Sequence, residues 1–151
     1  MKIQLVCLLL VLLTATVLTQ DTKINKRYKK FINQHIIKTM SARSCYKEMQ
    51  ERKINIKKSM CKKINTFILA SAEDVRSVCV DKGVPYHKMT KSIEDFDIVV
   101  CNRTNKQGKR AKCQYHGDKL KNKKILIKCE KGFPVHYDGD IVLDTNRNNI
   151  Y

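Results

Sequence analysis

The sequence contains no internal repeat, no long linker and, beyond its N-terminal segment, no apolar run that could cross a membrane. Acidic residues are scarce, with 14 Asp and Glu against 31 Lys and Arg, and no carboxylates cluster at the spacing of metal ligands. We therefore expect a single domain whose chemistry uses no metal ion and no other cofactor.

The N-terminal segment has the pattern of a secretory signal peptide. A basic start precedes the apolar run 5–13, which is too short to span a bilayer, and small and polar residues follow. We predict cleavage within residues 15–20, with the bond after Thr19 favoured. The chain then divides into a signal peptide, residues 1–19, and one secreted domain, residues 20–151.

The cysteines indicate a disulfide framework. Of the seven in the chain, Cys7 lies in the predicted signal peptide, which leaves an even number in a short secreted domain. Three bridges could each contribute about 2–4 kcal/mol to the free energy of unfolding. Spacing alone does not choose among their connectivities. The six cysteines are Cys45, Cys61, Cys79, Cys101, Cys113 and Cys129.

The formal charge of +17 falls by one if Lys2 leaves with the signal peptide. Such an excess makes a polyanion the natural partner, and RNA, a heparin-like glycan or an anionic bacterial surface all fit. The basic tract 52–58 is either a solvated positive face or a signal for nuclear entry or heparin binding. Charge alone does not decide between these partners.

Residue periodicity predicts an α+β domain with three short helices followed by a largely antiparallel sheet. The predicted helices are an amphipathic one whose apolar face holds residues 28, 31, 32, 35 and 36, one from 45 to about 53, and one from a capping box at 71–74 to about 83. The predicted strands are 61–67, 96–100, 111–115, 124–129 and 135–137, with turns at 102–109 and 138–139. A glycosylation sequon begins at Asn102, in the first of these turns.

Three basic side chains could cleave RNA if the fold brings them together. His35 and His136 could divide the work, one taking a proton from a 2′-hydroxyl and the other giving a proton to the departing 5′-oxygen. Lys62, beside a half-cystine, could stabilise the negative charge that develops on phosphate. The need for a 2′-hydroxyl would restrict such a site to RNA.

Each of these residues also has a purely structural interpretation. His35 could be a satisfied core residue, and Lys62 could belong to an ordinary surface strand. His87 and His116 compete for the catalytic roles, although both have the context of surface residues. His136 has the better context, because it lies within a predicted strand and Asp138 follows closely enough to orient its ring.

Three motifs resemble those of the pancreatic-type ribonuclease superfamily. Residues 61–67 fit the signature Cys-Lys-x-x-Asn-Thr-Phe, residues 34–35 fit the Gln-His of its first helix, and residues 134–138 resemble its Pro-Val-His-Phe-Asp. The motifs occur in the family's order, and the resemblance spans nearly the whole mature chain. It implies a kidney-shaped, disulfide-stapled α+β fold and cleavage of RNA to a 2′,3′-cyclic phosphate and a 5′-hydroxyl.

The resemblance also implies residue roles, with His35 as base, His136 as acid and Lys62 as the cation that stabilises the phosphorane. Thr66 would read the base and accept both uracil and cytosine, since a hydroxyl both donates and accepts. The further substrate-binding residues are Gln34 and Lys30 for phosphates, Asn65 of the signature, Tyr137 for the pyrimidine, Asp138 beside the second histidine, and Glu130 for the downstream base.

The cysteine count points to the angiogenin-like branch, which has three disulfides. Family order implies the pairs Cys45–Cys101, Cys61–Cys113 and Cys79–Cys129, without the bridge that shapes the purine pocket. Angiogenins obstruct the pyrimidine site with a glutamine where this chain has Gly139, so we expect more activity here.

The resulting expectation is a secreted, monomeric, pyrimidine-preferring endoribonuclease, with antibacterial, vessel-growth and nuclear roles all compatible with the resemblance. The alternative is a cationic protein that acts on bacteria or glycans through its charge.

Overall fold

The structure, a computed structural model, describes residues 2–54, 56–57, 60–105 and 113–141. Its elements in chain order are α1 (Lys2–His35), β1 (Ile36–Ile37), the 3₁₀ helix η1 (Ala42–Ser44), α2 (Cys45–Glu51), β2 (Ile56–Lys57), β3 (Met60–Cys61), β4 (Ile64–Leu69), α3 (Ala72–Ser77), β5 (Gly83–Tyr86), β6 (Met89–Ser92), β7 (Phe96–Arg103), β8 (Tyr115–Glu130) and β9 (Phe133–Ile141).

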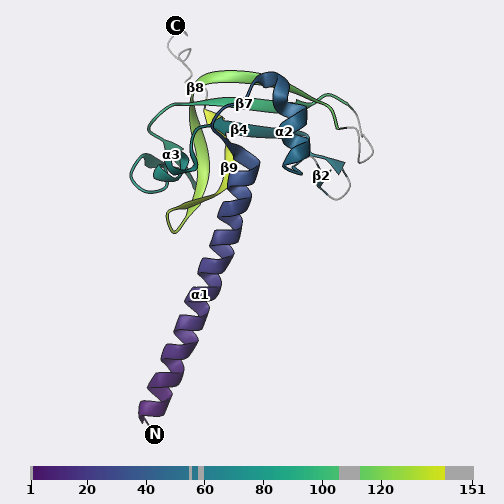
Figure 1. The fold of residues 1–151 in the computed structure, drawn as a ribbon. Coiled ribbons are helices and arrows are strands. Elements are labelled where there is room, and N and C mark those ends of the chain that lie inside the picture. Colours follow the sequence, from purple (N-terminus) through teal and green to yellow (C-terminus); the bar gives the residue numbers. More distant parts are fainter. Residues whose placement is uncertain (1, 55, 58–59, 106–112, 142–151) are drawn as a thin grey trace.

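Helix α1 joins the predicted signal peptide to the predicted first helix. Its apolar N-terminal part extends away from the rest of the molecule, whereas its C-terminal end packs on the sheet (Figure 1). The helix is long and apolar enough to cross a membrane, a property that an N-terminal signal sequence shares. The signal peptide stays a prediction. Ile36, expected on the helical stripe, instead opens β1 and pairs in parallel with Ile68 of β4.

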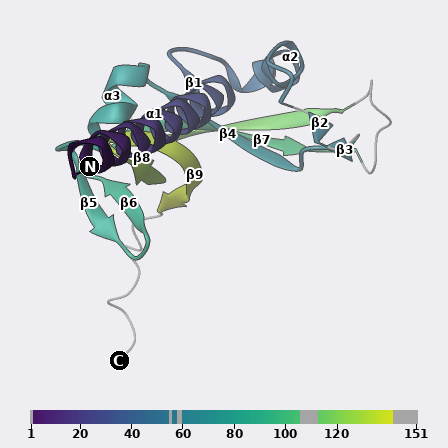
Figure 2. The same ribbon diagram turned by 90° about the horizontal axis from the view of Figure 1, so that it is seen from below.

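One curved sheet forms the body, with strand order β1-β4-β7-β8-β6-β5 and with β9 also paired to β8. The long strand β8 makes this possible, because its first part pairs with β7 and its second part with β6 and β9. All pairs in this sheet are antiparallel except the two-residue pair of β1 and β4. Figures 1 and 2 show β8 bending across the molecule. The predicted α+β class is confirmed.

Strand β4 lies between two apolar clusters. Ile68 packs with Phe31, Ile98 and other residues beneath α1 and α3, whereas Phe67 packs with the residues around α2. Because both faces of β4 are covered, its side chains from Asn65 to Ile68 form a buried run rather than an alternating pattern. Burial of each large apolar side chain contributes about 1.5–3 kcal/mol. This strand carries Asn65, Thr66 and Phe67 of the signature, so the core holds these three residues in place.

Three disulfides cross-link the domain, in the pairing that family order implies. Their Cα–Cα distances are 5.6 Å for Cys45–Cys101, 5.7 Å for Cys61–Cys113 and 5.6 Å for Cys79–Cys129. In the described part of the chain, Cys7 is the free cysteine. The bridge at Cys61 anchors the chain next to Lys62.

The capping box at Ser71 is confirmed, since the Ser71 hydroxyl accepts a hydrogen bond from the backbone N–H of Asp74 at 3.1 Å. The helix that it starts is shorter than expected and ends at Ser77. Strands β5 and β6 follow as a hairpin where the sequence pattern showed none.

The predicted turn at 138–139 is wrong, and the predicted turn at 102–109 begins later than expected. Asp138 and Gly139 lie inside β9, where Leu126 pairs with Gly139 and Ile127 with Tyr137, so Asp138 is an extra residue in a β-bulge. The chain instead turns at Lys131 and Gly132, which have φ values of 48° and 78°. Asn102 belongs to β7, and residues 106–109 of the same predicted turn lie outside the described residues.

Candidate active site

A cleft of about 810 Å³ opens between the C-terminal end of α1, strand β4 and strand β9. Nine of the ten catalytic and substrate-binding residues expected from the sequence line it, although they come from three separate stretches of the chain. They are Lys30, Gln34, His35, Lys62, Asn65, Thr66, His136, Tyr137 and Asp138. The cleft is also lined by Gly139, at the position where angiogenins have a glutamine, and by residues to which the sequence analysis gave no role in the site: Lys53, Ile54, Ile64, Val100 and Asp140.

His35, the last residue of α1, is only 8% exposed. Its Nδ1 lies 2.8 Å from the backbone oxygen of Thr66. Because a carbonyl only accepts, Nδ1 must carry the proton, which leaves the lone pair of a neutral ring on Nε2. Burial lowers the pKa of His35 to about 4, and the charges of Lys62 and His136 act in the same direction, whereas the Thr66 hydrogen bond opposes them. The ring is therefore neutral near pH 7.

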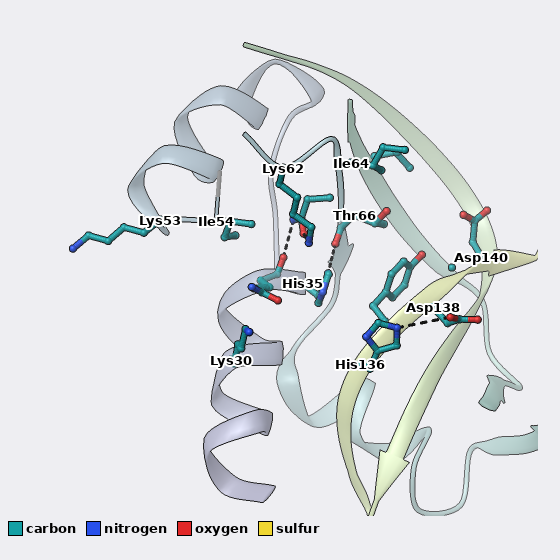
Figure 3. Close-up of a pocket in the computed structure, with 15 residues that line it drawn as sticks. Lys30, His35, Lys53, Ile54, Lys62, Ile64, Thr66, His136, Asp138 and Asp140 are labelled. Carbon is teal, nitrogen blue, oxygen red and sulfur yellow. Dashed lines mark hydrogen bonds and ion pairs between the residues drawn. The ribbon is translucent and has the colours of Figure 1, made fainter. Parts of the chain in front are cut away.

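Asn65 connects the lysine to the helix that bears His35. Its side-chain amide donates to the backbone oxygen of Gln34 at 2.8 Å, and its Oδ1 accepts from Lys62 Nζ at 2.8 Å. Asn65 is only 1% exposed, and both of its hydrogen bonds are partly buried. The Asn of the signature thus holds the ammonium group at the cleft (Figure 3).

His136 enters the cleft from β9, and its side chain is 57% exposed. Its Nε2 lies 3.8 Å from Asp138 Oδ1, a distance that allows an ion pair but is too long for the hydrogen bond that the resemblance implied. Figure 3 shows Asp138 on the side of the ring remote from His35. A second bulge, at Val135, precedes His136, because Lys128 pairs with His136 and Cys129 with Pro134. Bulges on both sides aim this pair of residues into the cleft.

Tyr137 and Thr66 form the wall next to the two histidines. The ring of Tyr137 stacks against that of His35, with centroids 5.3 Å apart and planes at 28°. Thr66 is buried on β4, directly opposite Val100 of β7. A flat ring and a hydroxyl that both donates and accepts suit a pyrimidine base.

Glu130 is the expected substrate-binding residue that does not line the cleft. Its carboxylate is paired with the guanidinium of Arg27 on α1. A second hollow of about 420 Å³ adjoins the cleft and shares Lys30, Gln34, His35 and His136 with it. Arg27 lines this hollow, together with Lys128 and Met89. The sequence did not predict that these three residues line a hollow. The Arg27–Glu130 ion pair in particular depends on how α1 packs against the sheet.

The competing histidines lie elsewhere. His87 is exposed in the turn between β5 and β6, with φ of 53°. His116 is exposed on β8, and its Nε2 lies 3.1 Å from Asp118 Oδ1. Neither is among the residues that line the cleft. Within the described ranges, no group of three or more His, Cys, Asp or Glu residues is placed to hold a metal ion.

Known proteins share both this fold and its motifs. The family model for pancreatic ribonuclease matches residues 26–138. The chain belongs to the pancreatic ribonuclease family. Ribonuclease-like 3 of Danio rerio is 31% identical over 148 residues, which cover 93% of this chain and 97% of that protein. Angiogenin-4 of Mus musculus is 35% identical over 122 residues, which cover 78% of this chain and 81% of that protein.

A solved structure supports the same assignment. The X-ray structure of zebrafish RNase5 matches with a TM-score of 0.73 and 36% identity, covering 78% of this chain and 96% of that one. Together with the three disulfides, these relatives confirm the angiogenin-like branch and the ribonuclease class that the motifs predicted.

Proposed function

We propose that the protein is a secreted, metal-independent endoribonuclease that cleaves RNA on the 3′ side of pyrimidines and leaves a 2′,3′-cyclic phosphate. The observation that carries this proposal is the meeting of three groups in one cleft: a neutral His35 with Nε2 unprotonated, the exposed His136, and the anchored Lys62. Family membership supports the RNA substrate.

His35 is the base of the cleavage step. The Thr66 carbonyl holds Nδ1–H, so Nε2 is the nitrogen that can take the proton of the 2′-hydroxyl. The pKa of His35, lowered by burial to about 4, keeps this nitrogen unprotonated near neutral pH. The buried helix end fixes the direction of the ring.

His136 is the acid, and Lys62 stabilises the transition state. The exposed His136 can exchange its proton with water between turnovers, and Asp138 Oδ1 lies 3.8 Å from its Nε2. Protonated His136 gives its proton to the departing 5′-oxygen. The Lys62 ammonium, fixed by Asn65, faces the negative charge that grows on the phosphoryl oxygens as the 2′-oxygen attacks.

The proposal is tested by the products and by the catalytic variants. Incubation with a cytidylyl or uridylyl dinucleotide should yield a 2′,3′-cyclic phosphate, seen by ³¹P NMR, with EDTA present. We expect His35→Ala, His136→Ala and Lys62→Met each to lower kcat by about 10²-fold or more. His87→Ala and His116→Ala are matched controls and should retain wild-type rates. Full activity in either His35→Ala or His136→Ala would contradict the mechanism.

A charge-based function is the second candidate, since the formal charge is +17. In this alternative, the protein binds glycans or bacterial surfaces, and RNA cleavage is incidental. Bacterial killing measured in parallel with cleavage separates the two. Killing that survives in His35→Ala and His136→Ala, while cleavage is lost, assigns the biological activity to charge.

Secretion is part of the same proposal and rests on the signal-peptide pattern of residues 1–19. Expression of the full chain in a secreting cell should release a protein whose N-terminus is Gln20 or lies near it. N-terminal sequencing of the secreted product measures this, and retention of the intact N-terminal segment would contradict it.

A further inference from the structure

The base-binding end of the cleft contains a polar group that the mechanism does not use. The hydroxyl oxygen of Tyr137 is buried, and among the described residues it has no hydrogen-bond partner. An unpaired buried hydroxyl destabilises the folded protein, because it has lost its hydrogen bonds to water without replacing them. A buried hydroxyl without a partner is expected in a substrate cleft if the bound substrate forms the missing hydrogen bond.

Asp140 and Thr66 are the polar residues beside this hydroxyl. Burial raises the pKa of Tyr137, and the negative charge of Asp140 raises it further, whereas the nearby Thr66 hydroxyl acts in the opposite direction. Asp140 lines the cleft three residues after Tyr137 on β9, beyond the bulge at Asp138. Tyr137 therefore keeps its proton and lies close to a carboxylate.

Charge is distributed unequally along the cleft. In Figure 3, Lys30, Lys53 and Lys62 lie on one side, whereas Asp138 and Asp140 lie on the other, beyond Thr66. A nucleotide would place its phosphate near the cations, so its base would extend past Thr66 toward Asp140. Val100, opposite Thr66 on β7, is apolar and cannot supply a competing hydrogen bond.

Uracil and cytosine differ at the edge that would face Asp140. Cytosine carries an exocyclic amine, which donates, where uracil carries O4, which accepts. An ionised carboxylate can only accept. The Tyr137 hydroxyl has no partner among the described residues, so its oxygen is available as a second acceptor beside the carboxylate. Both groups can accept a hydrogen bond from the amine of cytosine, whereas O4 of uracil meets a carboxylate that cannot donate to it.

We propose that the Tyr137 hydroxyl and Asp140 together form an amine-accepting end of the base pocket, which selects cytosine over uracil. The inference rests on the proposed cleavage at pyrimidines and adds a preference that Thr66 alone cannot give, because its hydroxyl serves either base. Asp140 and Tyr137 are specificity residues in this scheme and take no part in proton transfer.

The first test compares kcat/KM for cytidylyl-3′,5′-adenosine and uridylyl-3′,5′-adenosine. The wild-type protein should prefer the cytosine substrate, and Asp140→Asn should lower that preference about tenfold, as expected for loss of a hydrogen bond to a charged group. Tyr137→Phe should lower it by a smaller factor, since the carboxylate remains. Asp81→Asn removes an exposed carboxylate that does not line the cleft and should keep the wild-type ratio.

The second test measures binding without turnover, by calorimetry with cytidine 3′-phosphate and uridine 3′-phosphate. Tighter binding of the cytidine nucleotide that disappears in Asp140→Asn supports the inference, even if neither dinucleotide is cleaved, in which case the proposed function alone fails. Equal binding of the two nucleotides by the wild-type protein, or a ratio unchanged in both Asp140→Asn and Tyr137→Phe, overturns the inference whatever the cleavage rate.

Discussion

The division of labour between the two histidines follows from where each lies. His35 is buried at a helix end and donates through Nδ1 to a carbonyl, whereas His136 is largely exposed on a strand beside a carboxylate. Burial disfavours the charged form of a histidine, and a neighbouring carboxylate favours it. One chemical group is thus suited to two opposite tasks.

The pKa of His35 is the first testable consequence. An NMR titration of its ring should give a pKa near 4, well below the ordinary 6.5, because burial and the neighbouring cations disfavour its protonation. Between these two values, the unfolded chain binds more protons than the folded one, so the free energy of unfolding should fall as the pH drops from about 6.5 to about 4. A His35 ring that titrates at or above 6.5 would contradict this account.

At the scale of elements, strand β9 does most to build the site. Its two bulges surround the His136–Tyr137 pair, and the bulge at Asp138 places Asp138, Gly139 and Asp140 along the cleft. A Cβ added at Gly139 would meet no atom within 4 Å, although its φ of 155° is strained for other residues. The position is therefore open to solvent and carries no obstruction.

Substitution of Gly139 measures what this opening contributes. We expect Gly139→Gln to lower kcat/KM on pyrimidine dinucleotides at least several-fold more than Gly139→Ala does, because only glutamine extends far enough to reach the base pocket. Gly139→Ala is the control for backbone strain, and thermal unfolding of both variants measures that cost. Equal activity in the two variants would contradict the idea of an unobstructed pocket.

Local sequence patterns correctly predicted the helices and strands that are specified by neighbouring residues in the chain. The capping box at Ser71 predicted the start of α3, and the alternation of apolar residues predicted β7. Strands β5 and β6 escaped prediction because Pro85 and the polar residues around it are tolerated at a sheet edge, where β8 supplies the pairing through β6. The bulge at Asp138 likewise depends on the register with β8. The sequence motif ends at residue 138, so it did not predict that Asp140 lines the cleft.

At the scale of the whole molecule, the fold joins residues 35, 62 and 136, which no local pattern connects. The motif order identified this set only by resemblance, and the convergence itself required the core around β4 and the pairing of β8 with β9. The Arg27–Glu130 pair was missed for the same reason, because it depends on how α1 docks.

The excess of positive charge should make RNA binding depend on salt. For Z phosphate contacts with single-stranded RNA, the logarithm of affinity should fall against the logarithm of salt concentration with a slope of about −0.7Z. Lys30, exposed between the cleft and the second hollow, should account for one such contact. Lys30→Gln should therefore reduce the slope by about 0.7, whereas Lys82→Gln, which alters a surface ion pair with Glu94, should not. A slope near zero would exclude the basic surface as the RNA-binding track.

Whether His35 and His136 face a single phosphate is the central claim, and one titration tests it directly. Inorganic phosphate is added to the protein while the ring signals of all four histidines are followed by NMR. We predict that the signals of His35 and His136 shift together with one dissociation constant, and that those of His87 and His116 stay in place. Shifts in only one of the two cleft histidines, or two different dissociation constants, would contradict the convergence on which the mechanism depends.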